Sequence, residues 1–164
     1  MCSFIEQLVS ELAGMDVEWD GSTSSIYLWD EKVPDGTYLL DVCPPYQSSW
    51  NTYVYYPNQT DSFLMLGKKY SNGLTLHPYD GHYAYFNLDG KYQSMTMTLG
   101  LVDGQEYAGG LAFFVDGKLV AKYTVQPGDY TQEITVPLNY GLHLEIRGIE
   151  KTSGKLGLGN ITVQ

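Results

Sequence analysis

The stretch that decides the fold reads Ser94-Met95-Thr96-Met97-Thr98-Leu99-Gly100-Leu101. Its large apolar side chains recur at every second position and alternate with threonine or glycine. A period of two gives a β-strand one face for the core and one wetter face. The same alternation recurs over residues 118–125, with Leu119 on the apolar face, and over residues 142–147, with Leu142 on the apolar face. We therefore expect strands in all three segments.

Glycine-containing turns separate these strands. Asp116-Gly117 lies between two apolar runs and is typical of a two-residue hairpin. Asp89-Gly90 and Asn72-Gly73 have a similar composition. No helical pattern of about ten residues lies between the strands, which excludes parallel βαβ units. From Thr37 onward the sequence predicts an all-β chain folded as an antiparallel β-sandwich or jelly roll.

The first part of the chain has a different pattern. Phe4, Leu8 and Leu12 recur at helical spacing and predict a short α-helix, and residues 16–19 and 25–29 predict a β-hairpin. A turn cluster, Pro34-Asp35-Gly36, follows. We therefore expect a helix plus hairpin over residues 1–32 and a sandwich over residues 33–164. The apolar face of the helix predicts packing on the sandwich or on a second copy of the chain, which would give a dimer.

Composition excludes several classes of protein. The chain has 164 residues and a net charge of −10, from 19 acidic and 9 basic side chains. Binding to nucleic acid or to an anionic membrane needs clustered cations, so both functions are disfavoured. No apolar run reaches the roughly 20 residues of a membrane helix. Glu6 and Glu11 interrupt the apolar N-terminus, which does not have the pattern of a signal peptide.

Catalytic and metal-binding motifs are poorly supported. No Gly-x-Ser-x-Gly sequence marks a nucleophilic serine, and the two cysteines, Cys2 and Cys43, can form one disulfide or stay free. His77 and His82 lie five residues apart without a further ligand at metal-site spacing, so we expect a polar loop and no metal. Glycoside cleavage needs two carboxylates at a defined separation, which the sequence does not give for its acidic residues. We expect no enzymatic activity and no cofactor.

The aromatic residues concentrate in one tract. Residues 46–56 contain Trp50, Tyr53 and three further tyrosines, next to prolines, serines and an asparagine. Sugars present apolar C–H faces edged by hydroxyl groups, and a flat ring beside polar groups complements them. The tract therefore favours a carbohydrate-binding surface. The alternative is that Tyr53 occupies one face of a strand and that Trp50 belongs to the core.

Four segments, in order along the chain, resemble the NPCBM family of carbohydrate-binding modules, which accompany bacterial glycoside hydrolases. They are residues 66–77, 84–92, 100–103 and 113–118. The resemblance implies a secreted, sugar-binding jelly roll with its ligand at loops on one end, and it matches His77 and Asp103 to residues of the family motifs. Related sandwiches often hold a structural calcium, which the acidic loops would permit. Residues 156–163 depart from the closing segment of the family, which is rich in tryptophan and aspartate.

Residues 4–29 are similar to the closing helix and hairpin of the copper amine oxidase N-terminal-like domain, a stalk or surface module of secreted bacterial proteins. This resemblance implies that only the tail of that domain is present. It carries no copper or quinone chemistry, because the small domain is not the catalytic part. We therefore expect an extracellular or cell-surface protein whose export signal lies upstream.

Together these observations predict a non-catalytic carbohydrate-binding module of an exported bacterial protein. Loops that follow alternate strands can gather at one end of a sandwich, so we expect three loops to form one shallow cleft. Aromatic rings there would hold the apolar face of the sugar, while His77 and Asp103 would bind its hydroxyl groups. The alternative is a structural or protein-interaction sandwich that has lost sugar binding. The predicted ligand-binding residues are Trp50, Tyr53, His77, Tyr79, Asp80, Asp103, Glu106 and Tyr107.

Overall fold

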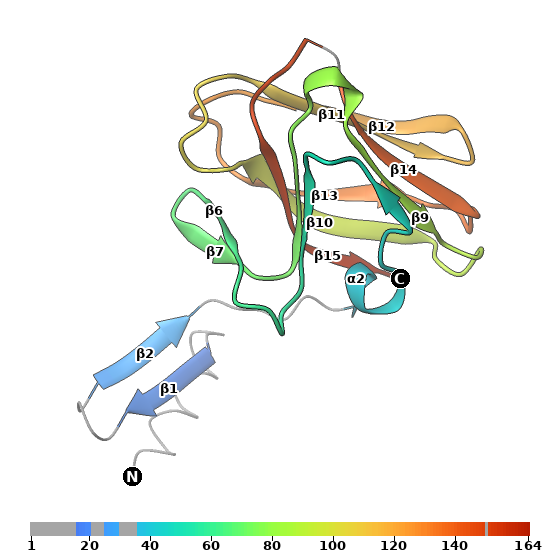
Figure 1. Ribbon diagram of the computed structural model, residues 1–164. Coiled ribbons are helices and arrows are strands. Elements are labelled where there is room, and N and C mark those ends of the chain that lie inside the picture. The colour runs from blue at the N-terminus through green and yellow to red at the C-terminus, as the bar shows by residue number, and fades with distance from the viewer. Residues whose placement is uncertain (1–15, 21–24, 30–35, 150) are drawn as a thin grey trace. The chain divides into compact units, whose positions relative to one another are not determined.

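The computed structural model describes residues 16–20, 25–29, 36–149 and 151–164 (Figure 1). The chain divides into two compact units, residues 1–35 and 36–164. In the first unit, β1 (Asp16–Asp20) pairs antiparallel with β2 (Ser25–Trp29). The hairpin expected in this region is therefore present. The helix expected from Phe4, Leu8 and Leu12 lies outside the described residues.

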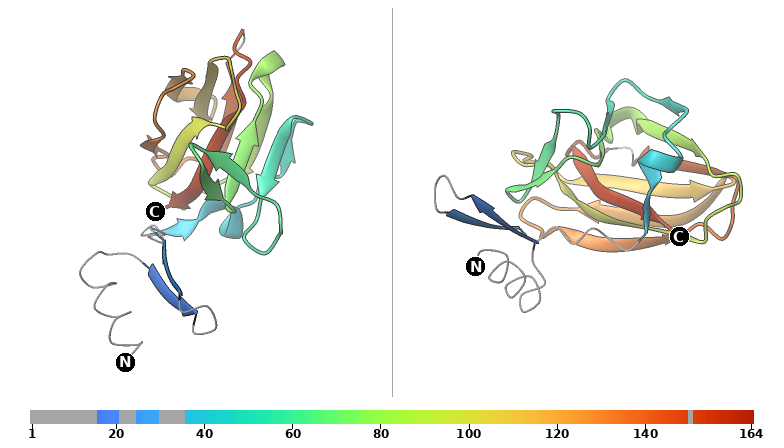
Figure 2. Two further views of the ribbon diagram at one scale, coloured as in Figure 1. Left: turned by 90° about the vertical axis from the view of Figure 1, so that its left-hand side faces the viewer. Right: turned by 90° about the horizontal axis from the view of Figure 1, so that it is seen from below.

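Two antiparallel sheets form the second unit, as the sequence predicts, and stack as a sandwich (Figures 1 and 2). The six-stranded sheet has the order β13–β10–β15–β8–β5, and β3 also pairs with β15. Its strands are β3 (Thr37–Tyr38), β5 (Thr52–Tyr55), β8 (Gly73–Leu76), β10 (Ser94–Leu101), β13 (Gln132–Pro137) and β15 (Leu156–Val163). The five-stranded sheet, in spatial order, consists of β12 (Lys118–Val125), β11 (Gly109–Val115), β14 (His143–Gly148), β9 (Tyr83–Asn87) and β4 (Gln47–Ser48).

Short elements complete this unit. They are helix α2 (Leu39–Val42), the short 3-10 turn η1 (Tyr79–Gly81), and a hairpin of β6 (Phe63–Met65) and β7 (Lys68–Tyr70). No helix among the described residues is long and apolar enough to cross a membrane. Directly after α2, the buried free thiol of Cys43 donates a hydrogen bond to the backbone oxygen of Asn87 at 2.9 Å. Burial, with the nearby Asp89 carboxylate, raises the pKa of this thiol, so Cys43 has the properties of a structural cysteine.

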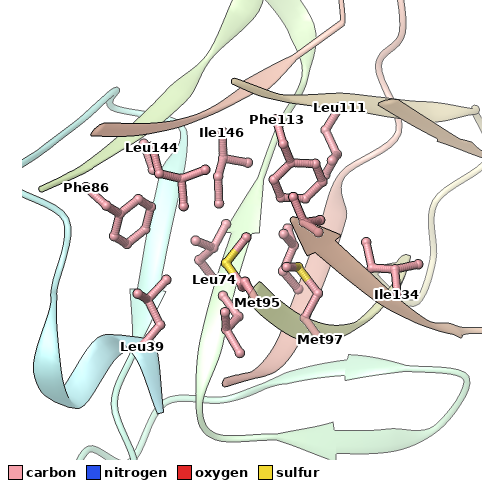
Figure 3. Close-up of a cluster of buried hydrophobic side chains, with 14 of the residues drawn as sticks. Leu39, Leu74, Phe86, Met95, Met97, Leu111, Phe113, Ile134, Leu144 and Ile146 are labelled. Carbon is pink, nitrogen blue, oxygen red and sulfur yellow. The ribbon is translucent and has the colours of Figure 1, made fainter. Parts of the chain in front are cut away.

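The core lies between the two sheets (Figure 3). Leu74, Met95 and Met97 of the six-stranded sheet point toward Phe113 and Ile146 of the five-stranded sheet, and all five side chains are fully buried. Burial of each is worth about 1.5–3 kcal/mol relative to exposure. The methionines of the β10 stretch thus occupy the core face that their alternation predicts.

One strand departs from the predicted alternation. β11 and β12 pair with a register shift, and Val120 is the extra residue of the resulting β-bulge. The bulge changes the alternation only before it: Ala121, Tyr123 and Val125 keep the predicted core face and Val120 also packs against the core, while Leu119 lies opposite the outward-facing Phe114. Leu119, expected in the core, is instead 56 % exposed.

The Asp116-Gly117 hairpin turn is confirmed. Both residues have positive φ, 50° and 79°, as a two-residue type I′ turn requires. The Asp116 carboxylate accepts hydrogen bonds from the backbone N–H groups of Leu142 at 3.1 Å and His143 at 2.9 Å. Because β14 begins only at His143, Leu142 lies in the preceding turn and is 63 % exposed, which corrects its expected place in the core.

The β6–β7 hairpin, green in Figure 1, packs on the outer face of the six-stranded sheet. Its buried side chains Phe63, Met65 and Tyr70 form a second apolar cluster. Glycines of β15 leave room for it, because a Cβ atom on Gly157 would lie 2.6 Å from the Phe63 ring and one on Gly159 would lie 2.2 Å from the Tyr70 ring. The packing of this hairpin on the sheet therefore depends on the absence of side chains at both glycines.

Strand register gathers five connections at one end of the sandwich. Thr52 pairs with Leu76, and both Leu76 and Leu101 pair with Leu156, so four strands of the six-stranded sheet end at the same level. Short connections lead from there into the five-stranded sheet. We call this region the loop end. It consists of residues 49–51, 77–82, 102–108, 126–131, 149 and 151–155.

Candidate functional site

Trp50 is a strongly exposed aromatic side chain of the loop end. It lies in the short connection between β4 and β5 and is 80 % exposed, so the alternative that Trp50 belongs to the core is wrong. Its indole meets the imidazole of His82 edge-on, with ring centroids 5.2 Å apart and an interplanar angle of 89°. His82 itself is only 7 % exposed. A buried imidazole thus positions an exposed indole.

Hydrogen bonds fix the connection that carries Trp50. The Ser49 hydroxyl lies 3.0 Å from the Thr52 hydroxyl and accepts a hydrogen bond from the Tyr83 backbone N–H at 2.9 Å. The side-chain amide nitrogen of Asn51 lies 3.3 Å from Nε2 of His82. These bonds tie the residues on both sides of Trp50 to His82 and to Tyr83, the first residue of β9, which limits the freedom of the indole.

His77 and Lys155 extend the site along the six-stranded sheet. The His77 backbone N–H donates to the Asn51 oxygen at 3.2 Å, and the pairing of Leu76 with Leu156 puts His77 beside Lys155. The Lys155 ammonium lies 4.8 Å from the ring centroid of Tyr53, within cation–π distance. Trp50, Asn51, Tyr53, His77, His82 and Lys155 are therefore connected through direct contacts or adjacent strands, and we call them the Trp50 group.

Within this group, the surroundings of His77 favour its uncharged imidazole, and the Lys155 ammonium has no carboxylate partner among the described residues. Burial lowers the pKa of His77, and the nearby His82 and Lys155 lower it further. Its Nδ1 atom is buried without a hydrogen-bond partner. Burial also lowers the pKa of Lys155. Within the described part of the chain the ion pairs are Lys91–Asp89 and Arg147–Glu145, so Lys155 has no carboxylate partner there.

Asp103, a predicted ligand-binding residue, contacts the β6–β7 turn. Its carboxylate accepts hydrogen bonds from the backbone N–H groups of Leu66 at 2.6 Å and Gly67 at 2.9 Å, one at each oxygen. It also lines a cavity of about 170 Å³ together with Gln105, Gln126 and Asp129, a volume below the 300–1,000 Å³ of typical small-molecule pockets. The Gln105 side chain accepts a hydrogen bond from the Lys155 backbone N–H at 2.9 Å, which joins this cavity to the Trp50 group.

The remaining predicted residues lie on neighbouring loops of the same end. Tyr79 belongs to η1, and Glu106 and Tyr107 belong to the connection between β10 and β11; all three side chains are exposed. The side chain of Asp80 lies outside the described part of the structure. Trp50, Tyr53 and His77 are thus brought together. Asp103 binds the β6–β7 turn, and Tyr79, Glu106 and Tyr107 lie on other loops of the same end.

Sequence reasoning missed Asn51 and Lys155, and it considered His82 only as half of a metal-binding pair. Asn51 is adjacent to Trp50 in the aromatic tract, which is the signal that could have identified it. Lys155 joins the site only through the pairing of β15 with β8, which no local motif encodes. Among the described residues, no three histidine, cysteine, aspartate or glutamate side chains converge as metal ligands would.

No family model matches the chain, and no curated protein matches its sequence. Solved structures match its fold. The tandem CBM51 modules of a family 98 glycoside hydrolase from Streptococcus pneumoniae superpose with a TM-score of 0.61 at 13 % identity, over 79 % of this chain and 46 % of theirs, so this chain spans about half their length. A chain of Clostridium perfringens ZmpB with an M60 catalytic domain and two CBM51 domains gives a TM-score of 0.60 at 16 % identity, over 94 % of this chain and 20 % of that one. The CBM51 of Clostridium perfringens GH95, solved with methyl-galactose, gives 0.58 at 13 % identity, over 79 % and 99 % of the two chains. The second unit therefore has the β-sandwich fold seen in carbohydrate-binding modules.

Proposed function

We propose that residues 36–164 form a non-catalytic carbohydrate-binding module that holds a glycan at the loop end, on the Trp50 group. The observation that carries the proposal is the indole of Trp50, which is 80 % exposed and yet held in place by the buried His82. An exposed tryptophan held in one orientation offers a large apolar face to solvent, and the apolar C–H face of a sugar would complement it. The fold shared with three chains that contain CBM51 modules supports the same function.

Polar groups beside the indole supply the directional contacts that a sugar needs. The His77 imidazole stays neutral at pH 7, because its pKa lies below the ordinary value of 6.5, and a neutral imidazole both donates and accepts hydrogen bonds. The Lys155 ammonium donates only, and it has no carboxylate among the described residues to compete with a ligand oxygen. Tyr53 adds a second exposed ring. One or two apolar faces with a few fixed polar groups are typical of small-ligand sites.

The absence of catalysis and the location of the protein belong to the same proposal. Of the carboxylates at the loop end, Asp103 already accepts two backbone hydrogen bonds from the β6–β7 turn, which favours a structural role over acid–base chemistry. Binding modules with this fold occur in chains that also carry glycoside hydrolase or M60 domains. We propose an exported bacterial protein, extracellular or at the cell surface, in which residues 1–32 belong to a separate, stalk-like unit.

A glycan array followed by calorimetric titration tests the proposal. We expect the purified chain to bind a subset of glycans, and methyl-galactose is the first soluble probe to titrate. Trp50→Ala should weaken binding about tenfold or more, because aromatic contacts in a desolvated site are worth on the order of 1 kcal/mol beyond the area they bury. The matched control is Tyr140→Ala, which removes an exposed ring at the opposite end of the sandwich.

Two results would contradict this function. If no glycan on the array is bound, the alternative of a structural or protein-interaction sandwich is favoured. If glycans are bound equally by wild type and Trp50→Ala, the ligand lies elsewhere on the molecule. Thermal melting of each variant separates loss of binding from loss of fold, and Trp50→Ala should change the free energy of unfolding by no more than about 0.5 kcal/mol, as exposed positions generally do.

A further inference from the structure

A second group of aromatic side chains lies on the outer face of the five-stranded sheet. Tyr83 and Tyr85 of β9 alternate with fully buried Ala84 and Phe86, so both tyrosines point away from the core. Strand pairing puts Tyr85 opposite Gln47 of β4 on one side and opposite Glu145 of β14 on the other. Together with Tyr46, Gln47 and His143, these two tyrosines form what we call the tyrosine network.

Contacts within the tyrosine network fix its geometry before any ligand binds. The rings of Tyr83 and Tyr85 stack with centroids 4.2 Å apart and an interplanar angle of 21°. The Tyr46 hydroxyl lies 2.7 Å from Nε2 of His143, and the Gln47 side-chain amide donates to the Tyr83 hydroxyl at 2.9 Å. The His143 ring also contacts Tyr85, with centroids 5.4 Å apart. Ordered aromatic side chains lose little entropy when they bind, which favours a recognition surface.

The charges beside the network are compensated internally. Arg147 pairs with Glu145 on the same strand, its Nε donating at 2.6 Å, and the guanidinium also covers the Phe114 ring at 4.9 Å from the centroid. Burial, followed by the Glu145 carboxylate, raises the pKa of Tyr85, so its hydroxyl stays protonated. Although the whole chain has a net charge of −10, the charges of Glu145 and Arg147 on this face compensate each other.

This chemistry selects among possible occupants. An anionic polymer needs clustered unpaired cations, whereas Arg147 is already paired and one lysine, Lys122 opposite Ala112, does not make a cluster. The core of a protein interface is largely apolar, whereas every ring of the tyrosine network carries a polar group, and most of these groups already take part in hydrogen bonds. A neutral sugar chain fits both features, because it combines C–H faces with hydroxyl groups and carries no charge.

We propose that the tyrosine network is a second glycan-binding surface, which takes an extended neutral oligosaccharide or polysaccharide. The network lies across β14, β9 and β4, which is two strand spacings or about 10 Å, and Phe114 of β11 continues the same face beneath Arg147, which suits a chain of sugars better than a single ring. The surface adjoins the loop end, since Tyr83 directly follows His82 and the Tyr83 backbone oxygen accepts a hydrogen bond from Ser49. Its ligand contacts are nevertheless independent of Trp50.

Affinity electrophoresis in gels that contain a soluble neutral polysaccharide tests this surface. The probes are galactan, galactomannan and xyloglucan, and the proteins are wild type, Trp50→Ala, Tyr46→Ala and Tyr85→Leu. We expect at least one polysaccharide to retard the wild type, Trp50→Ala to keep part of this retardation, and each tyrosine variant to bind about fivefold more weakly. Tyr46→Ala changes an exposed residue and leaves the core intact. Tyr140→Ala removes an exposed tyrosine outside both the network and the loop end, in the connection between β13 and β14, and is the matched control.

The results that would refute the tyrosine network as a binding surface differ from those that would refute glycan binding at the loop end. If none of the three polysaccharides retards the wild type, or if Tyr46→Ala and Tyr85→Leu run as the wild type does, the second surface is refuted whatever Trp50 binds. If Trp50→Ala alone abolishes retardation, all binding occurs at the loop end and the second surface is again refuted. If light scattering shows a wild-type dimer that Tyr46→Ala converts to a monomer, the face is a contact between copies of the chain. Loss of small-sugar binding in Trp50→Ala, by contrast, concerns only the loop end.

Discussion

The indole of Trp50 and the imidazole of His82 meet at an interplanar angle of 89°, with one ring exposed and the other buried. In this arrangement the edge of one ring contacts the face of the other, a geometry that aromatic rings prefer over face-to-face stacking. His82 is in turn fixed by Asn51 and by its backbone oxygen, which accepts a hydrogen bond from Gly148 at 2.8 Å. The orientation of the Trp50 indole therefore depends on the fixed position of the His82 imidazole.

Substitution of His82 should accordingly impair both stability and binding. His82→Ala removes the ring that supports Trp50 and leaves the Asn51 amide without its partner, at a cost of about 1–3 kcal/mol in the free energy of unfolding. We expect a lower melting temperature and weaker sugar binding. Trp50→Ala should weaken binding without lowering the melting temperature. If His82→Ala keeps wild-type affinity in calorimetric titration, the imidazole does not position the indole.

Asp103 is predicted to stabilise the β6–β7 hairpin. Asp103→Ala removes the acceptor for two backbone N–H groups, those of Leu66 and Gly67, and should lower the free energy of unfolding by about 1–2 kcal/mol. Hydrogen exchange should become faster at these two amides. Unchanged exchange there, combined with a large loss of sugar affinity, would assign Asp103 to the ligand site instead.

The glycines of β15 should resist substitution because of the hairpin above them. Gly159→Ala would put a Cβ atom 2.2 Å from the Tyr70 ring, and the displacement of that ring should cost about 1–3 kcal/mol. Tyr70→Ala removes the obstacle, so the double variant should be less destabilised than the sum of the two single changes. Additive effects in thermal melts would show that the hairpin does not press on this strand.

The sequence predicts the sandwich well and the site only in part. Alternation in the β10 stretch is a local property that tertiary structure leaves intact, so the burial of Met95 and Met97 could be predicted. The β-bulge at Val120 arises from pairing between two strands, and no single strand encodes it, which is why Leu119 was misplaced. The exposure of Trp50 is consistent with its proline- and serine-rich tract. Lys155 reaches the site through contacts distant in sequence, so no motif could reveal it.

The pH dependence of stability provides a test of the environment of His77. Its pKa in the folded protein lies below the ordinary value of 6.5, mainly because of burial and next because of His82 and Lys155. Between the folded value and 6.5, the unfolded chain binds more protons than the folded chain, so stability rises with pH in this window. As the pH falls from 6.5 toward the folded pKa, His77 therefore progressively destabilises the fold.

His77→Gln should reduce this loss, because an amide does not titrate. We expect the melting temperature of the wild type to fall more than that of His77→Gln between about pH 7.5 and about pH 5, the range in which histidines ordinarily titrate. Carboxylates also destabilise the fold at acidic pH. Their contribution is the same in wild type and His77→Gln, so it cancels when the two changes in melting temperature are subtracted. Lys155→Met removes one of the charges that lower the pKa of His77. The loss of stability that His77 causes at acidic pH should therefore be smaller in this variant. Identical pH profiles for wild type and His77→Gln would mean that the imidazole is solvated as in the unfolded chain, and that its place beside Lys155 is wrong.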